Sequence, residues 1–428
     1  MDSRAAIARD EGKHNTPASF PKKHDVILIQ RAQANEQPQL KASLSSSPSA
    51  RYFYYFDEFV QRNVFTPTVT AYNLDVQRLL GAGSEEPLHY AVLALGALQA
   101  SKAGAYSRAD RKKHELAALE AYSTSLLALR NTMANCPIPP RLVVFWTTLL
   151  LGIFELMNGK TGDGWLMHMV HGTANALQAA GPLACQSGLG LSFFLQARIF
   201  EASRALLLGE ASFLSDPEWD CPISSTQSPG GSLENPDLDA ILGIIVQCSK
   251  LRAEVVQLLE RVGLSDANQT PIDAPGLAAE GFHLREKLEL WRARNPCPPI
   301  QDSPDPCKPA RFDLPLESML SNVFFAAISI YLSGIFDYEI LHWKRWRIAV
   351  PTITEMEVQR HLGQILSLTS LALQETSLSP LLFLFPLRIA GARCSKEWQM
   401  DCVQVLLTRI SRSYAVATVF QRELNNIW

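Results

Sequence analysis

The chain has 428 residues, of which 47% are hydrophobic and 19% charged, and its formal net charge is −3. A chain of this length and apolar content can bury a large core, as one big domain or as two to three ordinary ones. The slightly negative charge excludes bulk attraction to phosphate, so any contact with DNA requires a local basic patch or a partner protein.

Cysteines occur singly along the chain, and the closest two are eight positions apart. They are Cys136, Cys185, Cys221, Cys248, Cys297, Cys307, Cys394 and Cys402. No Cys-x-x-Cys occurs, which excludes a zinc finger, a binuclear zinc cluster or a thioredoxin motif built from local sequence. The first residues are polar and lack the apolar run of a secretory signal, so we expect a reducing compartment for these thiols.

The first fifty residues differ in composition from the rest of the chain. Residues 1–50 are rich in Ser, Pro, Gln, Lys and Ala and show no helical periodicity, which predicts a disordered polar arm. Residues 51–428 are helical in pattern and nearly free of strand signals. The aromatic stretch 51–60 predicts a segment that anchors the start of this helical part to its body.

Three helices are predicted next, at 88–102, from Ser107 to about 133, and at 142–156. Ser107 and Asp110 form an N-capping signal for the second of them. The third is apolar all round, which indicates a helix enclosed by other helices. At about fifteen residues it is shorter than the roughly twenty needed to cross a bilayer, so we expect no membrane contact.

An amphipathic helix is predicted after the Gly-rich turn 158–164, running to residue 182. His168, His171, Asn175 and Gln178 are spaced three, four and three positions apart and therefore share one polar face. Such a stripe is typical of the solvent-exposed side of an amphipathic helix. The alternatives are that it lines a small-molecule pocket or donates metal ligands, although no third ligand is evident nearby.

The remaining chain predicts an all-α fold. Proline-rich loops are expected at 215–237 and 295–309. Helices are expected at 191–209, 238–262, 277–294, 316–343, 354–376, 380–393 and 397–425, and Thr354 with Glu357 has the spacing of a capping box. No repeat of fixed period occurs, so the architecture is a large multi-helix bundle or a set of stacked helix pairs.

Catalytic motifs are missing from the sequence. Gly159-Lys160-Thr161 resembles the end of a phosphate-binding loop, but Phe154 stands where its leading glycine is required. Asp-Asp pairs, which helical enzymes use to hold magnesium, do not occur. We therefore predict that the chain is not an enzyme, and we assign no catalytic, cofactor-binding or metal-binding residue and no cofactor.

Local basic clusters are small and separated. One lies around Arg108 to Lys113 and another at residues 344–347 (KRWR). Phosphate binding needs several cations on one face, because affinity grows with the number of charges neutralised. Clusters of three or four residues beside acids are typical of solvated helix faces, so no direct DNA binding is expected.

Several short segments resemble one known family, and they occur in the family's order. Residues 88–98 (LHYAVLALGAL) look like its opening helix, and residues 149–156 look like its buried helix. Further matches are Tyr122-Ser123 with Leu126-Leu127, Gly164-Trp165, His168, Gly172-Thr173, Gly181-Pro182, Phe194, Ala197-Arg198, residues 201–204, Trp219, residues 385–391 and Trp428. On these residues the chain resembles the fungal-specific transcription factor domain, the helical regulatory part of fungal binuclear zinc cluster regulators, over roughly residues 50–428.

The resemblance implies a nuclear, all-helical module that regulates RNA polymerase II transcription, often of a metabolic or secondary-metabolite gene set. Its expected partners are other transcription regulators or a DNA-bound partner, together with a small-molecule effector. The family's six-cysteine zinc cluster is not present in residues 1–50. Three explanations stay open: an upstream exon, a DNA-bound partner, or a domain with another role, such as an all-helical enzyme or a ligand-binding adaptor.

Overall fold

The structure is a computed structural model of the whole chain. It describes residues 47–66, 72–81, 86–103, 107–135, 141–159, 172–219, 236–263, 270–297 and 314–428. Contacts join Tyr52–Trp428 into one unit, distinct from Met1–Arg51. The predicted disordered arm falls outside the described residues as far as position 46.

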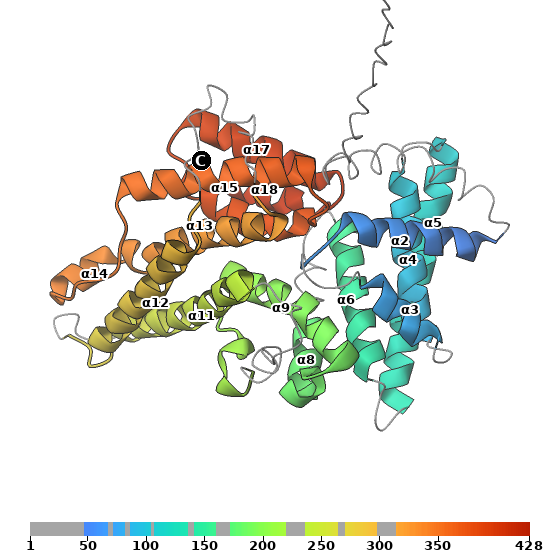
Figure 1. The fold of residues 1–428 in the computed structure, drawn as a ribbon, viewed down its shortest axis with the longest axis horizontal. Coiled ribbons are helices and arrows are strands. Elements are labelled where there is room, and N and C mark those ends of the chain that lie inside the picture. Colours follow the sequence, from blue (N-terminus) through green and yellow to red (C-terminus); the bar gives the residue numbers. More distant parts are fainter. Residues whose placement is uncertain are drawn as a thin grey trace, which may run out of the picture. The chain divides into compact units, whose positions relative to one another are not determined.

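The all-α fold class is confirmed. In the described ranges the chain forms α-helices and short 3-10 helices, and its only β contact is an isolated parallel bridge between Val64 and Leu378. Within the unit Tyr52–Trp428, helices α2 to α6 gather at one end and α11 to α18 at the other, with α9 between them (Figure 1).

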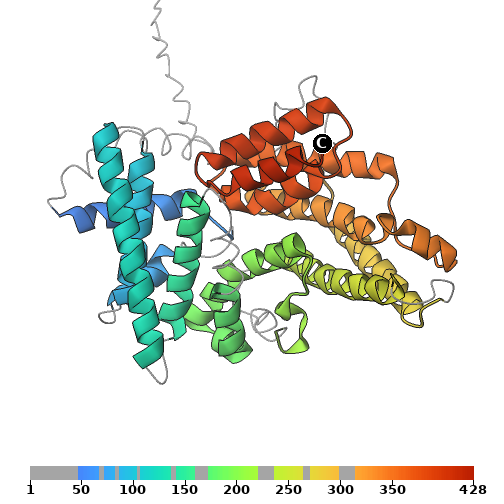
Figure 2. The same cartoon turned by 180° about the vertical axis from the view of Figure 1, so that it is seen from behind.

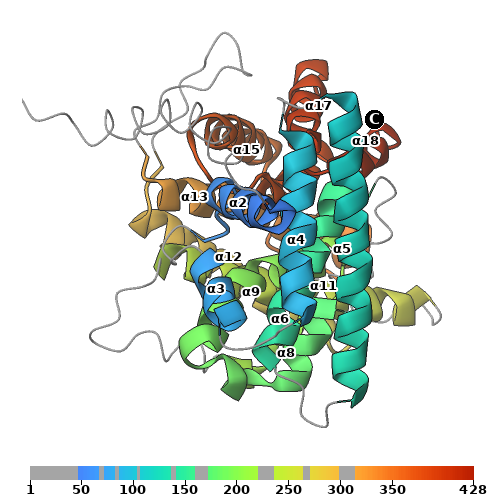
Figure 3. The same ribbon diagram turned by 90° about the vertical axis from the view of Figure 1, so that its right-hand side faces the viewer.

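The N-terminal group is built around a pair of long helices. Its members are α2 (Pro48–Arg62), α3 (Asn73–Gly81), α4 (Glu86–Lys102), α5 (Arg108–Asn135) and α6 (Arg141–Asn158). Helices α4 and α5 pack along each other, and α4 also packs on α6 (Figure 2 and Figure 3). The backbone of α2 crosses α4 so closely at Gly96 that a Cβ there would lie 1.9 Å from the carbonyl oxygen of Tyr52. A glycine is therefore required at this crossing.

The predicted starts and burial of these helices agree with the structure, with two differences. Ser107 Oγ accepts a hydrogen bond from the Asp110 backbone N–H at 3.2 Å, so Ser107 caps α5 as expected. The apolar helix α6 is buried, with Trp146 fully enclosed. The differences are that α2 begins at Pro48 rather than at residue 51, and that α3 has no counterpart among the helices expected from the sequence.

The middle of the chain consists of one long helix, α9, with short helices before and after it. They are α8 (Ala174–Ala180), η2 (Pro182–Cys185), α9 (Gly188–Leu208), η3 (Phe213–Ser215) and η4 (Pro217–Trp219). On α8, Asn175 and Gln178 are exposed while Leu177 is buried, as the solvent-exposed alternative predicts. His168 and His171 lie outside the described residues. The predicted loop 215–237 begins with η4, whose Trp219 is buried against Phe194.

The C-terminal group stacks helices in layers. Its members are α11 (Pro236–Gly263), α12 (Ala274–Arg294), α13 (Leu316–Asp337), α14 (Ile340–Arg345), α15 (Glu355–Glu375), η5 (Pro380–Phe383), α16 (Leu384–Gly391), α17 (Glu397–Ser411) and α18 (Ala417–Asn425). Helix α11 packs on α12 and α13, and α15 covers α13 (Figure 1). The capping box at the start of α15 is confirmed, because Thr354 Oγ1 accepts from the Glu357 N–H and Glu357 accepts from the Thr354 N–H.

The expected single helix over 316–343 is wrong. Helix α13 ends at Asp337, whose carboxylate accepts hydrogen bonds from Ser333 Oγ at 2.6 Å and from Arg393 at 2.8 Å. The chain then turns into α14, and the buried Trp343 packs edge-on against Phe336 at 5.2 Å. In a continuous helix Phe336 and Trp343 would lie about two turns, roughly 10.5 Å, apart along the axis, so the turn brings the two rings together.

The expected single helix over 397–425 is also wrong. Helix α17 ends at Ser411 and α18 begins at Ala417. Between them Tyr414 enters the core, where its hydroxyl donates to Asn63 Oδ1 and lies 3.3 Å from Ser379 Oγ. The break thus allows a buried polar link between the end of α2 and the C-terminal helices.

Helix α13 is the one described helix that is long and apolar enough to cross a membrane, over Ser318–Asp337. Of that apolar window, 89% is buried inside the fold. Packing within the unit accounts for this hydrophobicity, since a core helix passes the same test of length and composition.

Candidate functional site

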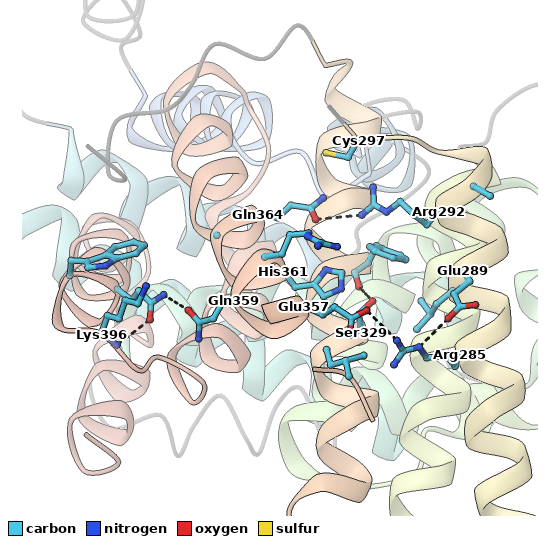
Figure 4. Close-up of a pocket in the computed structure, with 18 residues that line it drawn as sticks. Arg285, Glu289, Arg292, Cys297, Ser329, Glu357, Gln359, His361, Gln364 and Lys396 are labelled. Carbon is cyan, nitrogen blue, oxygen red and sulfur yellow. Dashed lines mark hydrogen bonds and ion pairs between the residues drawn. The ribbon is translucent and has the colours of Figure 1, made fainter. Parts of the chain in front are cut away.

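A cavity of about 830 Å³ lies among α12, α13, α15 and the start of α17 (Figure 4). Its volume is in the range of pockets that hold small organic ligands. The apolar part of the wall consists of Leu288, Phe325, Ile353 and Trp398. The ionisable part consists of Arg285, Glu289, Arg292, Cys297, Glu357, Arg360, His361 and Lys396. Apolar surface with a few convergent polar groups is what a ligand site requires.

The capping box of α15 forms one edge of the cavity. Glu357 accepts from both the Thr354 backbone N–H and the Thr354 hydroxyl at 2.8 Å, and these bonds lower the pKa of the Glu357 carboxyl. Arg285 lies between two carboxylates, with Nε 3.2 Å from Glu289 and Nη2 3.8 Å from Glu357. The charge of Arg285 is therefore compensated inside the site.

Arg292 is placed differently. Its guanidinium lies over the ring of Phe325, with Cζ 3.9 Å from the ring centroid. Its hydrogen bonds go to uncharged groups: Nη1 donates to Asn322 Oδ1 at 2.7 Å, and Nη2 donates to Gln364 Oε1 at 3.5 Å. The guanidinium also bonds the Cys297 thiol, whose pKa is raised by burial. Burial lowers the pKa of Arg292, and no described carboxylate forms an ion pair with it. The site thus contains a half-buried cation with only neutral partners.

His361 lies beside this arginine on α15. Its ring packs edge-on against Phe325 with the centroids 5.6 Å apart, and its buried Nδ1 has no hydrogen-bond partner in the described structure. Burial, followed by the nearby charges of Arg292 and Arg360, lowers the pKa of His361 to about 4. The imidazole is therefore neutral near pH 7.

Cations outnumber acids around the cavity. The lining contains four cations and two acids: Arg285, Arg292, Arg360 and Lys396, and Glu289 and Glu357. Both acids lie against Arg285, and neither Arg360 nor Lys396 forms an ion pair with a described residue. The lining therefore has an excess of positive charge, which favours an anion.

A second hollow, of about 730 Å³, lies between α11 and α12 and differs in character. Its charged residues are of both signs, with the bases Lys250 and Arg261 and the acids Glu254, Asp273 and Glu280. Arg261 and Asp273 pair at 3.1 Å while both are at least half exposed. This hollow therefore resembles a solvated groove, and its Arg261 and Asp273 charges compensate each other.

The basic clusters named from the sequence are exposed helix surface. Arg108, Arg111 and Lys113 lie on the outer side of the first turns of α5, and Lys344 and Arg345 lie on α14. In the described ranges no group of three or more His, Cys, Asp or Glu side chains has the arrangement of a metal site. No sequence motif marks the cavity residues, because they come from four separate segments of the chain. Among them only Glu357 stands in a recognisable sequence signal, as the capping partner of Thr354.

Comparison with known proteins identifies the family. The chain matches the profile of the fungal specific transcription factor domain over residues 51–428, and it therefore belongs to that family. The family is regulatory, and its members are transcription factors. Membership confirms the resemblance seen in the short segments of the sequence.

An individual relative adds little about activity. The chain is 28% identical over 190 residues to the Emericella nidulans protein named "Uncharacterized protein AN5342". The match covers 40% of this chain and 40% of that protein. No solved structure matches the chain.

Proposed function

We propose that this protein is a nuclear regulator that controls RNA polymerase II transcription of a fungal metabolic or secondary-metabolite gene set. The observation that supports this most is the family match over residues 51–428. The helical domain would receive an effector or a partner protein, and a DNA-bound partner or an upstream exon would supply contact with DNA. The net charge of −3 and the exposed, scattered basic clusters are consistent with DNA binding by another module.

A helical regulatory domain suits this role for a physical reason. Packed helices commonly have discrete alternative arrangements, and a ligand that binds one arrangement more tightly shifts the population toward it. The cavity among α12, α13 and α15 gives an effector a place to act on this packing. The proposal therefore assigns the cavity the role of an effector site.

Deletion of the gene in its own fungus tests the function. We expect transcripts of a coherent gene set to change, and the wild-type gene returned at another locus should restore them. Loss of an enzyme would instead leave transcripts largely unaltered and cause a substrate to accumulate. That second result, in transcript and metabolite profiles from the same cultures, would refute the regulator assignment.

An adaptor role is the second candidate, because one observation favours it. Helix α5 has Leu116, Leu119 and Leu127 on one side, with 43% to 60% of each side chain exposed. Large apolar side chains on a helix surface favour a protein partner. An adaptor acting away from DNA predicts that a fluorescent fusion of the chain stays outside the nucleus and that deletion leaves transcripts unchanged.

A further inference from the structure

Arg292 determines which class of effector the cavity suits. A half-buried guanidinium loses hydration, and amide or carbonyl oxygens replace that hydration without neutralising the charge. Its oxygen acceptors are of this neutral kind: Asn322 Oδ1, Gln364 Oε1 and the Asn295 carbonyl at 3.3 Å. Its remaining partner is the Cys297 thiol, whose pKa is raised by burial. A guanidinium has five N–H donors in a planar fork, so donors remain for a ligand.

We propose that the cavity binds a small organic acid, whose carboxylate pairs with Arg292 and whose apolar body lies against Leu288 and Trp398. This inference deepens the proposed function and rests on it for the claim that the acid acts as an effector. Planar carboxylates match the fork of a guanidinium and form two parallel hydrogen bonds with it.

The apolar body of the ligand follows from the wall around Arg292. Leu288 and Phe325 are buried there, whereas Trp398 at the start of α17 is 41% exposed although its ring is large. A flat or aliphatic body would cover the exposed part of Trp398 and bury apolar surface on both sides.

A single negative charge fits better than a phosphate dianion. Arg292 is the one half-buried cation of the lining without a carboxylate partner, since Arg285 is compensated by Glu289 and Glu357. Arg360 is exposed at the rim, where its field is screened by water. A dianion would leave one charge uncompensated inside the cavity, which is costly.

The test uses the full chain and a matched pair of probes. Binding of 2-naphthoate and of its neutral analogue 2-naphthamide is measured by isothermal titration calorimetry. We expect the wild-type chain to bind naphthoate roughly 10- to 100-fold more tightly than naphthamide, because hydrogen bonds to charged groups are the strong ones. Equal binding of the two probes, or no binding of either at millimolar concentration, would overturn the proposal.

Variants then locate the charge that matters. Arg292→Gln should remove most of the preference for naphthoate, whereas Arg294→Gln, an exposed residue on the same helix outside the lining, should keep it. Equal naphthoate affinity in wild type and Arg292→Gln would also overturn the proposal. Helical circular dichroism checks that both variants fold, and if Arg292→Gln does not, the wild-type comparison of the two probes still decides.

Cys297 reports the place of binding without any substitution. Its thiol borders the cavity next to Arg292, and its pKa is raised by burial although Arg292 opposes this. Naphthoate in the cavity should slow alkylation of Cys297 by iodoacetamide, measured by mass spectrometry of its peptide, and leave the rate at Cys394 unchanged. Slowing at neither cysteine would show that naphthoate binds elsewhere and contradict the assignment.

Two outcomes separate this inference from the proposed function. If gene deletion changes a coherent transcript set but naphthoate binds no better than naphthamide, the regulator stands and the ligand class is wrong. If naphthoate binding depends on Arg292 but deletion leaves transcripts unchanged, the cavity chemistry stands and the regulator assignment is wrong. A 2-naphthyl phosphate that binds ten times more tightly than naphthoate would overturn the preference for a single charge.

Discussion

The crossing of α2 over α4 gives a prediction whose size follows from one distance. A Cβ on Gly96 would lie 1.9 Å from the carbonyl oxygen of Tyr52 and 2.7 Å from its carbonyl carbon. These are backbone atoms of α2, so no side chain can rotate to make room. Gly96→Ala must therefore push the two helices apart or distort one of them.

The expected cost combines two opposing effects. Overpacking that moves the backbone costs about 3 kcal/mol at the upper end of its usual range. The better helix propensity of alanine stabilises the folded chain by about 1 kcal/mol. The net loss for Gly96→Ala is thus about 2 kcal/mol. A unit of this size has an unfolding entropy of roughly 0.8 kcal/mol/K, so Tm should fall by about 2–3 °C.

Thermal unfolding followed by circular dichroism at 222 nm measures the shift. Gly243→Ala is the matched control, because Gly243 lies inside helix α11 and a Cβ there meets nothing within 4 Å. Gly243→Ala should raise the free energy of unfolding by about 0.5–1 kcal/mol and raise Tm by about 1 °C. If Gly96→Ala is as stable as the wild type, or stabilises the chain as the control does, the close crossing of α2 and α4 is wrong.

Three further predictions concern buried charge, a helix cap and pH. Arg204→Met leaves the Glu201 carboxylate, which is 3% exposed, without the cation that it binds at 2.7 Å. The free energy of unfolding, measured by heat or urea, should fall by about 3–5 kcal/mol. A fall below about 1 kcal/mol would contradict the buried pair. Thr354→Ala removes the cap of α15 and should cost about 1 kcal/mol, and an unchanged Tm would refute the cap. Burial and Arg292 lower the pKa of His361 to about 4, so the folded chain resists a proton that the unfolded chain accepts, and stability falls as pH drops from about 6.5 to 4. Between pH 7 and pH 5, the Tm of the wild type should fall further than the Tm of His361→Asn. Equal falls in Tm for the two chains would contradict the lowered pKa of His361.

Local signals in the sequence were sufficient for the starts of α5 and α15 and for the burial of α6. The apolar helix 142–156 is enclosed, as a helix without a polar face must be. Ser107 and Thr354 cap the helices that follow them, because capping depends on bonds between residues three positions apart. Interactions of this range are visible in one short segment of sequence.

Helix breaks could not be predicted in this way, because distant residues cause them. The break before α18 places Tyr414 beside Asn63, although these residues are far apart in the sequence. The break after α13 is accompanied by a bond from Arg393 to Asp337, and no proline or glycine stands between α13 and α14. Helix α3 was missed for the opposite reason, since its nine residues are too few for a clear periodicity.

The cavity was hidden from the sequence for the same physical reason as the breaks. Arg292, Phe325 and His361 come from three helices, and in the sequence each is an ordinary residue of an amphipathic or apolar helix. The unusual property is the absence of a carboxylate partner for Arg292 in the described structure. That property depends on the packing of α12 against α13 and α15, so no pattern within one helix predicts it.

The contacts of Arg292 also indicate which helix an acid ligand would influence. The bond from Arg292 to Asn322 of α13 is short, at 2.7 Å, whereas the bond to Gln364 of α15 is long, at 3.5 Å. Since a carboxylate is a stronger acceptor than an amide oxygen, it would replace the weak bond to α15 before the strong bond to α13. Helix α15 is joined to α17 by the bond from Gln399 to Gln359 at 2.6 Å. A ligand at Arg292 would therefore bias the packing of α15 and α17 against α13, and its effect cannot exceed its difference in affinity for the two arrangements.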